Sequence, residues 1–278
     1  MELRGANAIV TGASRGIGVY IARALAERGV NLVLSARSAA ELEAVRAEMA
    51  GLGVNAAAIP CDIADPSERA ALVERSHSQI GPIDIVVNNA GIETAGQFHT
   101  TAEDDLARVL DVNLMAPMLL TRALLPGMIE RGRGHVVNIS SGAGKVGVPY
   151  AASYSASKHG LVGLTHSLRA EYDRSPVGFS VVCPVFVSST GMYDRWQRGG
   201  VKAPWFVGRS TPERVAKVVV SCIKRNRSDV LVNVPPVRPL VALMSVAPAI
   251  EPALMRLFGY TRTFERAAEF ERRSGSDE

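Results

Sequence analysis

The stretch YSASK, residues 154–158, places the phenol of Tyr154 and the ammonium group of Lys158 four positions apart. On a helix these positions lie one above the other on the same face, so the two polar groups can converge on one point. A free phenol has a pKa of about 10, and lowering it by about three units requires about 4 kcal/mol of interaction that favours the phenolate. An adjacent ammonium group can contribute this in a desolvated cleft. We interpret the pair as an acid–base centre, and a solvated helix face is the alternative that the spacing alone leaves open.

A glycine-rich stretch near the N-terminus has the composition of a phosphate-binding loop. The sequence TGASRGIG, residues 11–18, joins a strand-like segment directly to the helical pattern VYIARALAERG. Its glycines permit a tight turn, close approach of a pyrophosphate to the backbone, and close packing of the helix on the strand. We therefore predict a dinucleotide site whose contacts here are Gly12, Ser14, Arg15, Gly16, Ile17 and Gly18.

The second strand-like segment ends in LVLSARS, beside the expected position of the adenosine ribose. A carboxylate there would bind the 2′-hydroxyl of NAD and repel a 2′-phosphate. The chain instead has Arg37, with Arg15 in the glycine loop and no acidic residue close by in the sequence. Two guanidinium groups suit a phosphate dianion, so the sequence favours NADP over NAD as the cofactor. Two solvated arginines are the alternative.

The composition is that of a globular protein, since 47% of the 278 residues are apolar and 21% are charged. Only 5% are aromatic and the arginines are scattered, so the net charge of +4 does not indicate a nucleic-acid partner.

The three cysteines stand far apart and the five histidines form no ligand pair, which predicts reduced thiols and no bound metal. A strand-like run starts almost at Met1 and leaves no room for a signal peptide, so we expect a cytoplasmic location.

Short runs rich in Val, Ile and Ala recur near residues 7, 31, 54, 83, 135, 179 and 230. Helix-period stretches separate them, at residues 16–28, 39–50, 66–79, 102–131, 154–174 and 211–225. Continuous apolar runs are typical of parallel strands covered on both faces, and parallel strands need crossover connections. The order predicts an α/β fold: a doubly wound, parallel, seven-stranded sheet of Rossmann type with helices on both faces. Residues 1–235 would form this domain, and residues 236–278 a helical extension.

One connection, residues 184–208, is long and carries Tyr193, Trp196, Trp205 and Phe206. Long irregular segments in compact domains often form lids or binding loops. The aromatic content of this connection favours a rather apolar substrate.

Six motifs, in order, resemble those of the short-chain dehydrogenase/reductase family in its compact single-domain branch. They are the glycine loop, Asp62 after the third strand-like run, NNAG at 88–91, Asn113, NISS at 138–141, and YSASK. The resemblance implies that Tyr154 exchanges a proton with the substrate oxygen. It also implies that Lys158 lowers the pKa of this tyrosine and holds the nicotinamide ribose.

The same resemblance assigns further roles. Ser141 would bind the substrate oxygen, with Ser140 as the alternative, and Asn113 would hold the water of a proton relay at a helix kink beside Pro117. The implied cofactor contacts farther along the chain are Asp62, Ile63, Asn89, Ala90, Gly91, Pro184, Val187 and Thr190. Val185 stands where the family usually has glycine, a departure that bears on the backbone path beside the nicotinamide.

These observations lead us to expect an NADP-dependent oxidoreductase that interconverts a ketone and a secondary alcohol on a rather apolar small molecule. A 3-oxoacyl reductase, acting on chains bound to a carrier protein or to CoA, is the alternative within enzymes. A cofactor-binding regulatory protein is the alternative outside them, and the intact set Asn113, Ser141, Tyr154 and Lys158 argues against it.

The helix that carries YSASK has a stripe of small residues, Ala156, Gly160 and Gly163. Intramolecular packing could explain the stripe. In the family that this chain resembles, however, the corresponding helix commonly pairs across a subunit interface. We therefore expect a homodimer or homotetramer.

The extension after Pro235 is apolar for only about a dozen residues, whereas a membrane-spanning helix needs about twenty. Leu240, Leu243, Met244 and Ala247 nevertheless follow a helical stripe that must find an apolar partner. In order of preference, that partner is the aromatic connection 184–208, the extension of another subunit, or the surface of a bilayer.

Overall fold

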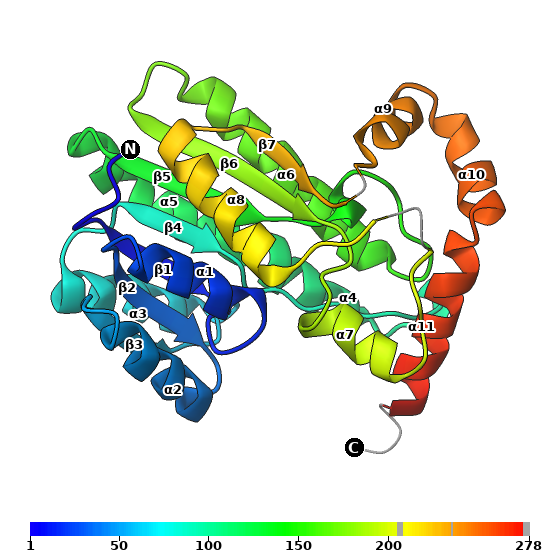
Figure 1. The fold of residues 1–278 in the computed structure, drawn as a ribbon, viewed down its shortest axis with the longest axis horizontal. Coiled ribbons are helices and arrows are strands. Elements are labelled where there is room, and N and C mark those ends of the chain that lie inside the picture. The colour runs from blue at the N-terminus through cyan, green and yellow to red at the C-terminus, as the bar shows by residue number, and fades with distance from the viewer. Residues whose placement is uncertain (205–207, 235, 275–278) are drawn as a thin grey trace.

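A seven-stranded parallel sheet forms the centre of the molecule, as the alternating pattern predicts (Figure 1). The strands are β1 (Asn7–Thr11), β2 (Asn31–Ala36), β3 (Ala56–Pro60), β4 (Ile85–Asn88), β5 (Gly134–Ile139), β6 (Val177–Pro184) and β7 (Asp229–Val232). Their order is β3-β2-β1-β4-β5-β6-β7, so the winding reverses between β1 and β4. Ligands of such sheets bind beyond the carboxyl ends of the strands at this reversal. The glycine loop follows β1 and the NNAG segment begins at the end of β4, which places both at that point.

The structure is a computed structural model that describes residues 1–204, 208–234 and 236–274. Trp205, Phe206 and Pro235, which figured in the predictions above, lie outside the described residues.

The strands bury side chains on both faces of the sheet. Ile9 and Val33 belong to the core on one side, whereas Val10 and Leu34 belong to the core on the other. Successive side chains of a strand point to opposite faces, so a strand covered on both sides must be apolar at every position. This explains why the strand-like runs are continuous in the sequence.

Two layers of helices cover the sheet (Figure 1). Helices α1 (Ile17–Ala26), α2 (Ala39–Ala50) and α8 (Pro212–Arg225) supply one core, and α3 (Pro66–Ile80) and α5 (Ala116–Glu130) supply the other. Helix α6 (Ala152–Glu171) lies beside α5 and packs on β6. Side-chain caps stabilise the N-termini of several helices. At α3, Asp65 accepts hydrogen bonds from the backbone of Ser67 and Glu68, and Pro66 occupies the first turn.

The predicted helix over residues 102–131 is divided into three parts. Helix α4 (Glu103–Leu110) passes into a π-helical turn, Asp111–Met115, which continues as α5. Such turns insert an extra residue into a helix and are frequent at functional sites. The turn contains Asn113, where the family resemblance implied a kink.

The connection 184–208 is less irregular than predicted, because helix α7 (Gly191–Arg198) lies within it. Buried Tyr193 and Trp196 fix this helix: Trp196 is only 4% exposed, and the Tyr193 hydroxyl accepts a hydrogen bond from the backbone of Ala203. Apolar burial of one face stabilises a helix that is too short to be stable alone.

The C-terminal extension forms α9 (Arg238–Val246), α10 (Glu251–Leu257) and α11 (Tyr260–Ser274), the orange-to-red arm in Figure 1. Helix α11 packs against α7: the rings of Phe264 and Trp196 meet edge to face, with centroids 5.5 Å apart. Glu271 accepts hydrogen bonds from Trp196 Nε1 at 2.9 Å and Arg195 Nε at 3.0 Å. Helix α11 thus contacts the connection 184–208, whereas Leu240 and Met244 of the predicted stripe pack with Val146, Leu254 and Met255, and Leu243 is 51% exposed.

One helical run, Glu103–Glu130, reaches the length and hydropathy of a membrane-spanning helix, with half of its apolar window buried in the fold. A core helix of a globular domain passes the same test. The helices of the extension have 9, 7 and 15 residues, each shorter than the roughly twenty that a span requires.

Candidate active site

Lys158 and Tyr154 lie on α6, with Lys158 buried against the end of β5. The Lys158 side chain donates a hydrogen bond from Nζ to the carbonyl oxygen of Ile139 at 3.1 Å. Its Nζ lies 5.6 Å from the centroid of the Tyr154 ring. The two polar groups therefore share one face of the helix, as their spacing predicted.

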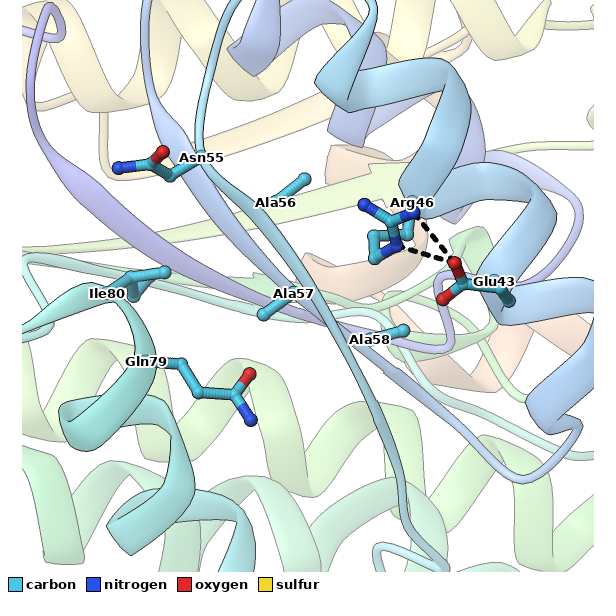
Figure 2. A pocket seen from close by; sticks show the side chains of 8 residues that line it. All are labelled: Glu43, Arg46, Asn55, Ala56, Ala57, Ala58, Gln79 and Ile80. Carbon is cyan, nitrogen blue, oxygen red and sulfur yellow. Dashed lines mark hydrogen bonds and ion pairs between the residues drawn. The ribbon is translucent and has the colours of Figure 1, made fainter.

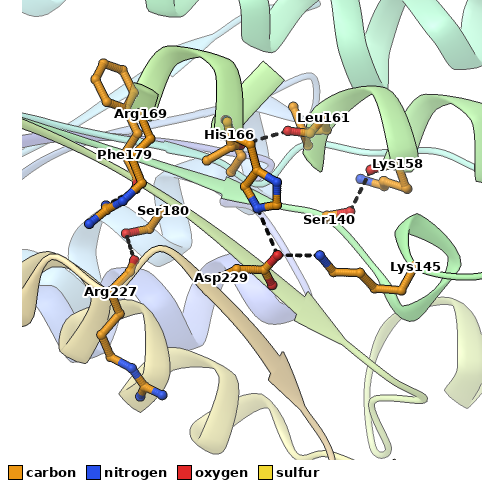
Figure 3. Close-up of polar contacts among 12 residues, drawn as sticks. Ser140, Lys145, Lys158, Leu161, His166, Arg169, Phe179, Ser180, Arg227 and Asp229 are labelled. Carbon is orange, nitrogen blue, oxygen red and sulfur yellow. Dashed lines mark hydrogen bonds and ion pairs between the residues drawn. The ribbon is translucent and has the colours of Figure 1, made fainter. Parts of the chain in front are cut away.

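The two serines after β5 have different partners. Ser140 is buried and donates from Oγ to the carbonyl oxygen of Lys158 at 2.9 Å, which holds α6 against the sheet (Figure 3). Ser141 caps a short turn at Gly142–Gly144 and forms a hydrogen bond with the Tyr154 phenol. The geometry thus places Ser141, rather than Ser140, beside the tyrosine.

An ion pair anchors the chain that follows Ser141. Lys145 contacts the carboxylate of Asp229 at the start of β7, and His166 Nε2 lies 3.0 Å from the same oxygen (Figure 3). The segment between the serine and α6 is therefore tied to the edge of the sheet.

Asn113 links the π-helical turn to the segment after β4. Its Oδ1 accepts from the backbone of Ile92 at 2.9 Å, and its Nδ2 donates to the Ile92 carbonyl at 2.8 Å and to Ser157 Oγ at 3.1 Å. The fully buried amide is held both by the segment after β4 and by Ser157 of α6. Its role in a water relay stays a prediction.

The environment of Tyr154 within the protein raises the pKa of its phenol. Burial and, secondly, the charge of Glu93 act in this direction, against the hydrogen bond with Ser141. The lowering by Lys158 that the family resemblance implies stays a prediction. Burial also lowers the pKa of Lys158 to about 8. Desolvation disfavours the charged form of each group, so it raises the pKa of the phenol and lowers the pKa of the ammonium group. The phenol therefore stays protonated at neutral pH, which is the form that can give a proton to a developing alkoxide.

The glycine loop forms a cradle with no room for side chains. Gly12 has φ of 63°, and a Cβ there would lie 2.8 Å from Ala90 Cα. A Cβ on Gly18 would lie 2.2 Å from the Gly12 carbonyl oxygen. Asn89 supports the loop, since its Nδ2 donates to the carbonyls of Thr11 and Gly12 at 2.9 and 3.0 Å. The loop leads into the N-terminus of α1, a site that favours phosphate, so its backbone fits a dinucleotide.

The other loop residues that were predicted to contact the cofactor lie in the same turn. Gly16 has φ of 65° and precedes α1, which starts at Ile17, while Ser14 is half-buried and Arg15 is exposed. A Cβ on Gly91 would come within 3.3 Å of Asn113 Oδ1 and 3.4 Å of Lys158 Nζ. Gly91 therefore brings the cofactor cradle next to the catalytic helix.

Both arginines expected to select NADP are exposed at the ends of β1 and β2. Neither Arg15 nor Arg37 forms an ion pair with a described residue.

Asp62, next to buried Ile63, is paired with Arg108 of α4, and Arg37 also lowers the pKa of that carboxyl. Arg108 lies in an acidic stretch of sequence, EDDLAR, and no signal there identifies it as a partner of Asp62.

The segment after β6 accommodates Val185 in place of glycine. Val185 remains paired with the sheet through a backbone hydrogen bond to Val232 at 3.1 Å. The left-handed turns come later, at Phe186 (φ 38°) and Ser189 (φ 66°). Such φ values are uncommon for residues other than glycine. In this segment the left-handed conformation therefore occurs at Phe186 and Ser189 and not at Val185.

Pro184, Val187 and Thr190 frame this segment. Pro184 ends β6, Val187 forms a bridge with Ser210, and Thr190 precedes α7. Thr190 Oγ1 would lie 3.6 Å from a Cβ on Gly16, so the segment reaches the glycine loop. The structure brings these predicted contacts to the same end of the sheet as Ser141 and Lys158.

An aromatic cluster covers the tyrosine on the substrate side. The Tyr154 ring packs against a core formed by α7, α11 and the turn before α6, with Tyr193, Trp196, Phe264 and Phe186 among its members. Ring centroids of Phe186 and Tyr193 are 4.9 Å apart. Glu93, Arg195 and Glu271 lie beside this cluster, and sequence analysis did not select any of the three.

A separate pocket of about 490 Å³ lies at the edge strand β3, between α2 and α3 (Figure 2). Glu43 and Arg46 form an ion pair across one side of it, and Gln79 and Ile80 line another. None of the predicted site residues lines this pocket. It is not part of the candidate active site.

Comparison with known proteins agrees with this geometry. A family model described as short chain dehydrogenase matches residues 6–199. Ketoacyl reductase HetN of Nostoc is 41% identical, over 96% of this chain and 94% of that protein. Dehydrogenase/reductase SDR family member 7B of Mus musculus is 34% identical, over 83% of this chain and 74% of that protein.

Solved structures show the same likeness. A variant of actinorhodin polyketide ketoreductase, crystallised with NADPH, has a TM-score of 0.75 at 33% identity, covering 82% of this chain and 95% of that one. A metagenomic short-chain oxidoreductase in complex with NADP has a TM-score of 0.70 at 37% identity, covering 84% and 98%. The chain therefore belongs to the short-chain dehydrogenase/reductase family.

Proposed function

We propose that this protein reduces the keto group of 3-oxoacyl substrates with NADPH. The observation that carries the proposal is the convergence of Ser141, Tyr154, Lys158 and Asn113 beside a glycine cradle at the reversal of the sheet. The relative named ketoacyl reductase matches 96% of the chain, including the segment that covers the tyrosine. Among the two enzyme alternatives, this favours the 3-oxoacyl substrate over a simple apolar ketone.

The cofactor would lie along the glycine loop, with its 2′-phosphate at Arg15 and Arg37. Both solved relatives named above hold NADPH or NADP, which supports the same choice here. When bound, the nicotinamide supplies hydride to the keto carbon. Gly12 and Gly18 allow the loop to fold this tightly, because a Cβ at either position would collide with the loop itself or with Ala90.

Side chains of the protein would carry out the proton transfer to the keto oxygen. Ser141 orients the keto oxygen, and the protonated Tyr154 phenol donates to that oxygen as negative charge develops on it. Lys158 would stabilise the resulting phenolate, and a proton from solvent would restore the phenol along the Asn113 side of the site. The phenol is protonated when the substrate arrives, because its pKa lies well above neutral pH.

A simple apolar ketone is the second candidate, favoured by the aromatic cluster of Phe186, Tyr193, Trp196 and Phe264. Oxidation of NADPH followed at 340 nm separates the two candidates. We expect S-ethyl 3-oxobutanethioate to be reduced with at least ~10-fold higher kcat/KM than heptan-2-one, which has the same chain length without the second carbonyl. Equal or better reduction of heptan-2-one would assign the protein to simple ketones. No consumption of NADPH with any carbonyl would favour the regulatory alternative.

We further propose that α11 acts as a lid on the acyl chain. Replacing Phe264 by Ala removes its packing on Trp196 and Tyr260. At buried positions, replacing Phe by Ala lowers the free energy of unfolding by about 3 to 5 kcal/mol. Helix α11 should loosen, so we expect KM for long acyl chains to rise about three- to ten-fold with unchanged Kd for NADPH. Val246→Ala, at a side chain 85% exposed on the same extension, is the matched control. An unchanged KM across chain lengths would contradict a lid.

A dimer through α5 and α6 remains a proposal. Part of the small-residue stripe has an internal explanation, since a Cβ on Gly160 already meets Leu114 at 2.7 Å. Gly163 and Ala156 are exposed, and a Cβ on Gly163 would meet nothing within 4 Å. An apolar groove of about 330 Å³, lined by Leu125, Leu164 and other residues of α5 and α6, lies on the same surface. These features support a subunit interface there.

A further inference from the structure

Glu93 lies at the substrate end of the active site. It follows Gly91 by two positions, in the segment that leaves β4 and is held by Asn113. The hydroxyls of Thr94 and Ser153 are 3.3 Å apart, which fastens this segment to the first turn of α6, one residue before Tyr154. Glu93 is therefore placed between the catalytic helix and the helices that cover it.

One carboxyl oxygen of Glu93, Oε1, is buried without a hydrogen-bond partner among the described residues. Its side chain is only 7% exposed, and Oε1 makes no hydrogen bond with the described residues. The nearest cation, Arg195 Nη2, is 4.0 Å away, beyond hydrogen-bonding distance. Arg195 is instead engaged by Glu271, at 3.0 Å from Nε and 2.8 Å from Nη2. Buried polar groups are almost always paired in folded proteins, so an unpaired one beside a catalytic centre indicates a ligand.

Among the described residues, four charged or titratable groups face Glu93: Tyr154 and Lys158 from α6, Arg195 from α7 and Glu271 from α11. Burial and the charge of Glu271 raise the pKa of Glu93 to about 8, although Arg195 and Lys158 act in the opposite direction. At pH 7 the protonated acid is then favoured by about ten to one. A protonated carboxyl has an O–H to donate, which a carboxylate lacks.

We propose that Glu93 recognises the second carbonyl of the 3-oxoacyl substrate, donating a hydrogen bond from its carboxyl group to the thioester oxygen. This inference rests on the function proposed above and names the residue that would select that substrate. In a 3-oxoacyl group one methylene separates the two carbonyls. With the keto oxygen held by Ser141 and Tyr154, the thioester oxygen must lie close by, and Oε1 of Glu93 is a buried oxygen there that has no hydrogen-bond partner among the described residues. A simple ketone would leave Glu93 unpaired, which is how a buried polar group discriminates between substrates.

The test compares two variants on two substrates. Glu93→Leu removes the donor, whereas Glu93→Gln keeps the shape and supplies a donor that does not titrate. The quantity measured is the ratio of kcat/KM for S-ethyl 3-oxobutanethioate to that for heptan-2-one. We expect this ratio to fall about ten-fold in Glu93→Leu and to stay near the wild-type value in Glu93→Gln. A ratio unchanged in Glu93→Leu, or equally low in both variants, would overturn the proposal.

A pH series adds a readout that a structural role would not change. In the wild type the ratio should fall as the pH rises through about 8, because the donor is present below the pKa of Glu93 and lost above it. In Glu93→Gln the ratio should stay flat. Lys158 titrates in the same range but serves both substrates, so it cancels in the ratio. A fall of equal size in Glu93→Gln would contradict the assignment.

Two controls separate this inference from its alternatives. Because Oε1 has no partner to lose, Glu93→Leu should melt at or above the wild-type Tm, with unchanged Kd for NADPH. A lower Tm together with equal losses on both substrates would make Glu93 a structural residue. If the wild type shows no preference for the thioester, the proposed function itself fails. If the preference exists and survives Glu93→Leu, only the role of Glu93 fails.

Discussion

Tyr154→Phe should lower kcat by at least ~10², the contribution expected of a lost general acid, while the Kd for NADPH stays unchanged. Phenylalanine keeps the ring that packs in the aromatic cluster and removes only the hydroxyl that meets Ser141. The fold should therefore survive, and the loss should appear in single-turnover reduction, where hydride and proton transfer are measured directly.

Tyr172→Phe is the matched control for this variant. Tyr172 caps the far end of the same helix and packs on Phe179, with ring centroids 5.8 Å apart. Its variant should keep the wild-type kcat. If Tyr154→Phe retained near wild-type turnover on a substrate for which hydride transfer limits the rate, another group would have to be the proton donor.

Replacing Arg15 and Arg37 together by Gln should reduce the preference for NADPH over NADH by ten-fold or more. A charge-assisted contact with a 2′-phosphate contributes about 1.5 to 3 kcal/mol, and each arginine would make one. Both guanidinium groups are exposed at the carboxyl ends of β1 and β2, and no described residue forms an ion pair with either. The measurement is kcat/KM for each cofactor at fixed ionic strength, since salt weakens contacts between exposed charges.

Arg28→Gln controls for the loss of positive charge on the same half of the sheet. Arg28 lies just after α1 and contacts Glu27, at 3.8 Å, and the carbonyl oxygen of Ala24. Its variant should leave the cofactor preference unchanged. Equal kcat/KM values for NADPH and NADH in the wild type would instead show that Arg15 and Arg37 are ordinary solvated residues, and that the preference expected from the missing carboxylate is wrong.

The order of strands and helices was predictable because the information is local. Each parallel strand is covered on both faces, as Ile9 and Val10 illustrate by entering different cores, so it must read as an unbroken apolar run. The helix within residues 184–208 was not predictable in this way. Its stability comes from Trp196 packing on Phe264, a residue almost seventy positions later, and helical periodicity in eight residues is too weak a signal to reveal it.

The sequence by itself determined the groups whose positions follow from short-range geometry. Tyr154 and Lys158 share a helix face because they are four residues apart, and the glycines of residues 11–18 leave space because they have no side chain. The preference for Ser141 over Ser140 came from the family resemblance, and the structure gives Ser140 a different partner, the carbonyl of Lys158.

Only the tertiary structure decided the electrostatic state of the site. In sequence, Glu93 is one acidic residue after a common motif, and Arg108 and Arg195 are two of many arginines. Packing of α7 and α11 over the segment after β4 buries Glu93 and raises its pKa, and burial of Tyr154 raises the pKa of the phenol. The physical reason is that desolvation depends on every element packed around a group. Those elements are brought together by contacts far apart in the chain, which no short stretch of sequence encodes.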